Sequence, residues 1–257
     1  MTFSEQIYYA LFKPSKYKEL VNLKTSRFVI FAIAISLVLG IVTTAVPAAA
    51  IISGFGGFET LFGKRIAPMK YEDGELSIEK PFELNIKGTY FVIDTEEDVV
   101  ADDKLDSDGY YVAFGKKNLK LALVYDHKIY QEQAFPLGYY LPEGFNNQML
   151  IQIIPVIYVG LFFGVLIKGI SFFVKYGFYA LILSLLINSI NKQFNLKLTS
   201  GQVFQLCFYG ETLGMVVSNF NMAMNFLPYD IVNIIMIFVS INIIMSAVVL
   251  MNPKHQV

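Results

Sequence analysis

The sequence has almost no cysteine, no tryptophan and little charge. Cys207 is the only cysteine among 257 residues, which excludes an internal disulfide and a cysteine-based metal cluster. Charged residues make up 16% of the chain, against about 25% in soluble domains. The net charge of −1 argues against a nucleic-acid-binding protein. Because 55% of the residues are hydrophobic, we predict a membrane protein in which Cys207 is a small core residue.

Motifs of common enzymes and metal sites are also missing. The two histidines, His127 and His255, lie far apart, and there is no Gly-x-Ser-x-Gly, phosphate-binding loop or His-Glu-x-x-His. The run from Asp103 to Gly109 resembles a calcium loop. In the EF-hand register, however, Lys104 and Gly115 stand where acidic residues are required. We therefore expect no enzyme, no metal site and no cofactor.

Residues 1–27 form a basic leader, with five Lys/Arg against two Glu. Phe3, Ile7, Ala10 and Leu11 recur at helical spacing until Pro14 interrupts the pattern. This spacing predicts a short amphipathic helix on the inner membrane surface. A solvated leader without membrane contact is the alternative.

Residues 28–52 form the first predicted transmembrane helix, since about 20 apolar residues cross the hydrocarbon core. The basic residues before it place the N-terminus in the cytoplasm. The alanines at 48–50 resemble a signal-peptidase site, but the apolar run exceeds the usual 7–15 residues, which favours an uncleaved anchor. Ala32, Ser36 and Gly40 form a stripe of small residues that would let another helix approach closely.

Residues 53–148 change character and carry 10 Lys/Arg against 17 Asp/Glu, a balance of −7. Apolar and polar residues alternate at 82–87 and 119–126, and β-rich runs occupy 89–94 and 109–114. These patterns predict a small antiparallel β domain of roughly five strands. The acidic run 94–108 is predicted to be a solvated strand connection. Since the domain follows one outward crossing, we expect it to be extracytoplasmic.

Residues 149–251 are predicted to be a four-helix transmembrane block, followed by a tail at 252–257. Its expected spans are residues 149–167, 177–191, 203–221 and 231–251. The segment from Lys168 to Lys175 is predicted to be an inner hairpin, although a longer second helix with a turn at Gly177 fits equally well. The predicted fold class is therefore an all-α transmembrane bundle of about five helices with an inserted small antiparallel β domain. Five crossings would place the tail outside.

Glu211 is the most unusual residue of the apolar block, because it lies near the middle of the predicted span at 203–221. An acid at the bilayer centre costs ~2.5–3.5 kcal/mol on insertion scales, so such residues usually face a bundle interior or a wet cavity. Glu211 is thus a candidate proton or cation site. The alternative is a structural glutamate, protonated or hydrogen-bonded near Thr212, Asn188 or Asn219.

Two Gly-x-x-x-Gly motifs, Gly160/Gly164 and Gly210/Gly214, occur in the second and fourth predicted spans. Glycines at this spacing allow close helix packing. We therefore predict that these two helices touch. The motif is common in apolar sequence, and packing rather than function is the preferred interpretation.

Several strings resemble a bacterial membrane-protein family, domain-of-unknown-function family 1189. They are Phe12-Lys13-Pro14-Ser15-Lys16-Tyr17, Asp73-Gly74-Glu75-Leu76, Phe91-Val92-Ile93-Asp94-Thr95 and Leu198-Thr199-Ser200-Gly201-Gln202-Val203-Phe204. Some members of that family are labelled maltodextrin-utilisation proteins, so the resemblance implies a link to carbohydrate uptake. The chain is also distantly similar to the Yip-type five-span membrane proteins. Neither resemblance supplies binding residues.

Two functions agree with these features. The first is a non-enzymatic, multi-pass accessory or adaptor protein of the cell membrane, with a membrane-protein partner such as a sugar permease. The second is a small ion-coupled transporter that uses Glu211. Against the transporter, inverted repeats are not evident in the sequence.

Overall fold

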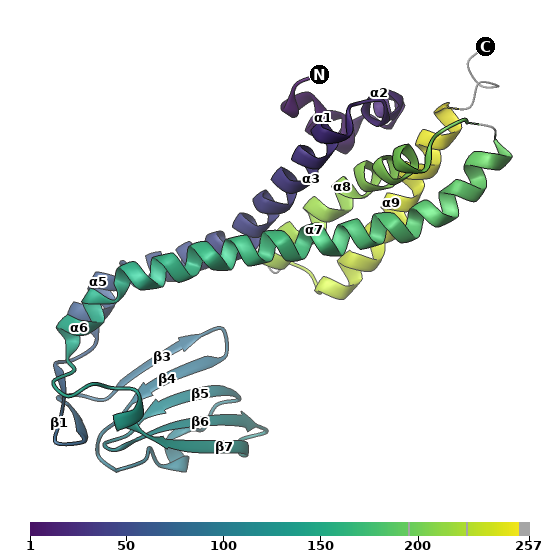
Figure 1. The fold of residues 1–257 in the computed structure, drawn as a ribbon. Helices are drawn as coiled ribbons and strands as arrows, with labels where there is room; N and C mark the ends of the chain where they lie inside the picture. Colours follow the sequence, from purple (N-terminus) through teal and green to yellow (C-terminus); the bar gives the residue numbers. More distant parts are fainter. Residues whose placement is uncertain (195, 225, 252–257) are drawn as a thin grey trace. The chain divides into compact units, whose positions relative to one another are not determined.

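A computed structural model describes residues 1–194, 196–224 and 226–251 (Figure 1). The chain divides into two compact units. Unit 1 comprises residues 1–49 and 160–257 and is helical, and unit 2 comprises residues 50–159 and contains all of the strands. The described chain is thus mostly helical with an inserted β domain, as the sequence predicts.

The leader of unit 1 folds into α1 (Phe3–Phe12), the 3-10 turn η1 (Pro14–Lys16) and α2 (Tyr17–Val21). Thr2 caps α1 in a reciprocal capping box with Glu5, and Pro14 ends the helix as predicted. Both helices pack against α8 (Ser200–Met224), and Gln6 and Ala10 are buried there. The leader is therefore part of the bundle, and not only a helix resting on a membrane surface.

The first predicted span is a continuous helix from Thr25 to Gly54, and it is long and apolar enough to cross a membrane. It consists of α3 (Thr25–Gly40), the π-helical turn η2 (Ile41–Ala45) and α4 (Val46–Gly54). The stripe of small residues is buried, and its last member, Gly40, packs against the backbone of α7 at Val165 and Gly169. Small side chains thus permit this close approach.

The predicted hairpin at residues 168–175 is wrong, because α7 runs unbroken from Ile154 to Gln193. Lysine is a good helix former, and the segment from Lys168 to Lys175 contains no proline to stop the helix. The Ser171 hydroxyl bonds within the helix, donating to Ile167 O four residues back (2.8 Å). The block therefore contains α7, α8 and α9 (Tyr229–Met251), with the short α6 (Asn147–Gln152) before them.

Three described helical segments are long and apolar enough to cross a membrane, where the sequence predicts five: Thr25–Gly54, Asn147–Gln193 and Tyr229–Met251. Two causes reduce the number from five to three. The second and third predicted spans form one helix, α7. Helix α8, the fourth predicted span, has a lower hydropathy than the other long helices. The expected position of the tail falls on residues 252–257, outside the described residues. Met251, directly before it, packs in the same core cluster as Ala10 and Leu20 of the leader.

Unit 2 contains a two-stranded and a five-stranded sheet. Strands β1 and β2 pair with each other, and the larger sheet has the order β3-β4-β5-β6-β7. The strands are β1 (Met69–Glu72), β2 (Glu75–Ile78), β3 (Phe82–Ile86), β4 (Thr89–Ile93), β5 (Gly109–Phe114), β6 (Asn118–Tyr125) and β7 (Lys128–Pro136). Short helical turns lie between them and at the borders of the unit: α5 (Phe58–Thr60), η3 (Leu61–Arg65), η4 (Asp102–Lys104) and η5 (Leu137–Tyr139).

The larger sheet is not wholly antiparallel, because β4 and β5 are parallel. A parallel pair requires a crossover connection, and the acidic run 94–108 provides it. Val100 and Leu105 of this crossover pack with Tyr111, Ala113 and other residues on one face of the sheet. The run is thus a strand connection, as predicted, but it also contributes to the core.

The opposite face of the sheet is covered over only part of its area. At one end, Ile93 and Phe114 pack with Leu76 of β2 and Leu137 of η5. Towards β6, the same face carries Leu121, which remains 39% exposed. Both faces of this sheet are therefore apolar, and one of them is partly open.

Candidate functional site

A cavity of about 170 Å³ lies among α7, α8 and α9 in unit 1. Helix α7 contributes Tyr176 and Tyr179, α8 contributes Glu211 and Ser218, and α9 contributes Ser240. Asn233 of α9 also lines it, and apolar residues complete the wall. The cavity therefore presents a few polar groups in an apolar surround, which is typical of small-ligand sites.

Glu211 is the buried acid of this cavity and is only 5% exposed. Neither carboxyl oxygen has a hydrogen-bond partner among the described residues. An unpaired buried carboxylate is costly, so such a group takes up a proton or binds a partner. The geometry leaves both oxygens available for either event.

Further polar atoms surround the cavity. The Asn219 amide donates to Tyr176 Oη (2.5 Å) and to Met215 O (2.7 Å), while Asn219 Oδ1 and Ser218 Oγ have no partner among the described residues. Unpaired buried acceptors of this kind are uncommon in folded proteins. They add hydrogen-bonding capacity to the region around Glu211.

A positive charge stands beside the same tyrosines. The Lys175 ammonium donates to Tyr229 Oη (3.1 Å) and lies over the rings of Tyr176, Tyr179 and Tyr229 at 5.2–5.8 Å from their centroids. Cation–π contacts of this length stabilise a partly desolvated ammonium. Lys175, expected in a turn, instead connects α7 to the start of α9.

The predicted polar residues are only partly brought together. Glu211 and Asn219 lie on α8 towards α7, but Asn188 is half-buried and does not line the cavity. The Thr212 hydroxyl donates to Phe208 O within α8. None of the three predicted partners of Glu211 therefore bonds to it. Sequence reasoning missed Tyr176, Tyr179 and Ser240, whose spacing on apolar helices resembles ordinary packing.

The glycines of α8 face α9. At Gly210, an added Cβ would overlap the Ile244 side chain. At Gly214, it would lie 2.6 Å from Ser240 Oγ and 3.2 Å from Met236 O. Glycine thus permits the close contact between these two helices.

The two helices that carry the motifs, α7 and α8, do meet at the hydrogen bond from Asn219 to Tyr176 Oη, but the glycines of the other motif do not make this contact. Gly160 has no neighbour within 4 Å of a built Cβ, and Gly164 would meet only Thr44 of η2, at 3.6 Å. Helix α7 instead packs closely against another helix at Gly169, opposite Gly40 of α3. A Gly-x-x-x-Gly motif in an apolar sequence therefore does not show which helix packs against it.

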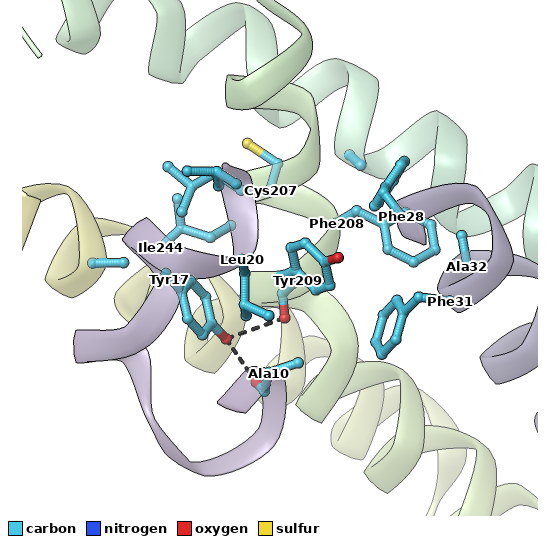
Figure 2. Packing of buried hydrophobic residues seen from close by; sticks show 14 of the residues in the cluster. Ala10, Tyr17, Leu20, Phe28, Phe31, Ala32, Cys207, Phe208, Tyr209 and Ile244 are labelled. Carbon is cyan, nitrogen blue, oxygen red and sulfur yellow. Dashed lines mark hydrogen bonds between the residues drawn. The ribbon is translucent and has the colours of Figure 1, made fainter. Parts of the chain in front are cut away.

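Figure 2 shows the core beside α8, where the leader enters the bundle. The Tyr17 hydroxyl is fully buried and lies 2.6 Å from Ala10 O and 3.1 Å from Tyr209 O. Phe28 and Phe31 of α3 pack edge-on or tilted against the Tyr209 ring. Cys207 is buried in the same cluster, as predicted. The leader is thus joined to the middle of α8.

Comparison with known proteins yields one match. A family model described as "Protein of unknown function (DUF1189)" matches residues 4–250. No curated protein and no solved structure matches.

Proposed function

Since the chain belongs to the DUF1189 family, whose description names no activity, we propose a function from its geometry. The protein is a non-enzymatic, multi-pass protein of the cell membrane that acts as an accessory or adaptor protein. Its strand-rich unit contacts another membrane protein, and the helical unit anchors it in the bilayer.

The distribution of polarity in unit 1 supports the membrane location. Helix α7 exposes a long run of apolar side chains, while the most polar helix, α8, is the most enclosed. The exposed members include Phe163, Ile167, Ile170, Val174, Phe178 and Leu185, and the buried members of α8 include Gln205, Glu211, Ser218, Asn219 and Asn221. Apolar surface outside and polar groups inside suit a protein whose solvent is lipid.

The proposed topology has four crossings, made by Thr25–Gly54, α7, α8 and α9. The basic leader favours a cytoplasmic N-terminus. Because Met251 packs in one cluster with the leader, an even number of crossings fits the bundle better than five. Neighbouring helices shield α8 from lipid, so its lower hydropathy is tolerated. Residues 53–148 are then extracytoplasmic.

The partly open apolar face of the large sheet carries the adaptor proposal. Tyr110, Leu121 and Leu123 lie side by side on β5 and β6, and Tyr110 is 62% exposed. An exposed apolar patch framed by polar residues is typical of an interaction surface. Gln131 and Gln133 of β7 border it on the same face. We propose that its partner is an integral membrane protein such as a sugar permease.

Photo-crosslinking in intact membranes tests this proposal. A photoreactive residue replaces Leu121 in the full chain, and the matched control replaces the exposed Lys80 in the loop before β3. We expect a discrete adduct with one membrane protein from position 121 and none from position 80. No adduct from position 121, or the same set of adducts from both positions, would exclude the surface as a docking site.

The second candidate function is an ion-coupled carrier, which the unpaired Glu211 carboxyl in its cavity favours. Glu211 would bind a proton or small cation, with Ser218 and Ser240 nearby as further oxygen ligands. Uptake of protons or sodium into vesicles containing the purified protein tests this function. Carrier activity predicts uptake by the wild type and at least a tenfold loss in Glu211→Gln. Equal uptake by both proteins would rule the carrier function out.

A further inference from the structure

A second cavity, in unit 2, is larger and entirely apolar. It has a volume of about 380 Å³ and lies between the sheet face at β3–β4 and segments 58–66 and 141–150. Leu84, Ile86 and Phe91 form its sheet wall, and Phe62, Phe145 and Leu150 lie on the other side. No polar side chain lines it. Such a cavity has no means of ordering water and suits a hydrocarbon ligand.

The size of the cavity indicates an extended alkyl chain. An apolar cavity of ~150 Å³ holds one benzene molecule, so this one has room for on the order of a dozen carbons. Protein cores seldom leave a void of this size, since missing contacts cost stability. Leu84 and Ile86 also remain half-buried, although they face the cavity. An occupant would complete their burial.

The walls of the cavity come from chain segments next to the predicted spans. Phe58 follows the end of the first apolar helix, Gly54, by four residues. Leu150 belongs to α6, inside the candidate span Asn147–Gln193. The wall residues of the cavity are therefore close in sequence to the helices that we propose cross the bilayer. The apolar ligand at hand in such a position is a bilayer acyl chain.

Two basic residues adjoin wall residues of the cavity in the sequence. Lys64 and Arg65 are exposed and lie in sequence between the wall residues Phe62 and Ile66. The Arg65 guanidinium lies over the Phe55 ring, 5.9 Å from its centroid, and neither residue has an acidic partner among the described residues. In a segment with a charge balance of −7, an unpaired basic pair suits an anionic phosphate.

We propose that this cavity binds one acyl chain of an anionic bilayer phospholipid, whose phosphate lies against Lys64 and Arg65. The proposal rests on the membrane location proposed above, but not on the adaptor role or on Glu211. Failure of crosslinking at position 121 would therefore leave it intact.

Tryptophan fluorescence provides the test, because the chain has no tryptophan of its own. Phe82→Trp places a probe in the cavity wall, and Glu83→Trp places a matched probe on the opposite face of the same strand. The full chain is reconstituted into nanodiscs of phosphatidylcholine with 20% phosphatidylglycerol brominated on its acyl chains. We expect at least twofold stronger quenching of the probe at 82. Ile86→Trp serves as a second wall probe if the first variant does not fold.

Equal quenching at positions 82 and 83 would show general contact with the bilayer and would overturn the proposal, as would the absence of quenching at both. A double variant, Lys64→Ser with Arg65→Ser, tests the headgroup. With the probe at position 82, we expect brominated phosphatidylglycerol to quench more strongly than brominated phosphatidylcholine. The double variant should lose this difference in quenching. Quenching by free brominated fatty acid, but not by phospholipid, would overturn the assignment to a bilayer lipid.

Discussion

At the residue scale, Glu211 is buried in largely apolar surroundings, and its carboxyl group has no hydrogen-bond partner among the described residues. A buried polar group without a hydrogen bond costs ~1–3 kcal/mol, so its removal stabilises the fold. We therefore predict that Glu211→Met raises the thermal midpoint of the full chain in detergent. Glu211→Gln is the shape-matched control and should gain less, because its amide stays buried. A lower midpoint for the methionine variant would indicate a bond that the structure does not contain.

Gly40 provides a second prediction at this scale. An alanine Cβ there would lie 2.7 Å from Val165 O and 2.9 Å from Gly169 N, both backbone atoms that cannot rotate away. We expect Gly40→Ala to destabilise the bundle by ~1–3 kcal/mol. Gly160→Ala is the control. An alanine Cβ there would meet no described atom of another segment within 4 Å, and alanine favours a helix over glycine by ~0.5–1 kcal/mol. Thermal unfolding in detergent compares the two, and equal midpoints would contradict the predicted contact.

The sequence reveals single residues when their chemistry conflicts with their surroundings. Glu211 and the small residues Ala32, Ser36 and Gly40 are recognisable because an acid, or a repeat of small side chains, is unusual in an apolar helix. The rest of the cavity is not recognisable in this way. The place of Tyr176 in the cavity becomes clear only when three helices are seen together. In the sequence, a tyrosine on an apolar helix does not differ from an ordinary packing residue.

At the element scale, the course of the chain is predicted best where proline or a change in period marks it. Pro14 ends α1, and alternation locates β3 and β6. The charge of Lys168 and Lys175 predicts a turn between them. Charge does not stop a helix, whereas a bundle can accommodate a lysine such as Lys175 that reaches a tyrosine. The parallel pairing of β4 and β5 depends on long-range contacts that no local pattern contains.

The crossover at residues 94–108 leads to a prediction about acid stability. Burial alone would raise the pKa of Asp94, but hydrogen bonds from the Lys104 ammonium (2.5 Å) and the Glu96 N–H (3.1 Å) outweigh it and lower that pKa. A lowered pKa in the folded state contributes stability above the unfolded value of ~3.9. This stability is lost as the pH falls through the folded pKa.

We therefore expect the unfolding midpoint of unit 2 to fall more steeply in the wild type than in Lys104→Met as the pH drops below about 5. Near-ultraviolet circular dichroism of the full chain in detergent reports this transition, since Tyr90 and Tyr111 stack in unit 2 at 4.6 Å between centroids. Other carboxyl groups titrate in both proteins, so only the difference is informative. Parallel pH profiles would show that Lys104 does not set the pKa of Asp94.

At the scale of the whole molecule, the proposed four crossings predict which segments reagents reach from outside. In a Cys207→Ala background, single cysteines replace Ser15, Ser107 and Gln256, the last in the tail beyond the described residues. We expect an impermeant thiol reagent on intact cells to label position 107 only, and positions 15 and 256 only after permeabilisation. Labelling at 256 on intact cells would restore the five-crossing arrangement.

The division into a helical and a strand-rich unit is the part of the whole molecule that composition predicts. The shift to 10 Lys/Arg and 17 Asp/Glu over residues 53–148 marks the insertion. The number of membrane-spanning helices is harder to predict, because α8 encloses many polar residues within unit 1 and these residues lower its hydropathy. The bilayer tolerates such a helix only when Glu211 and its neighbours are enclosed.

The hydrogen bond from Tyr17 to Tyr209 O joins residues 192 positions apart, and this separation has a consequence for biogenesis. A ribosome makes the leader before α8 and α9, the two helices against which the leader packs. The leader thus leaves the exit tunnel before the helices against which it packs. Maturation of this protein should end with a late docking event, which an N-terminal fusion partner would delay.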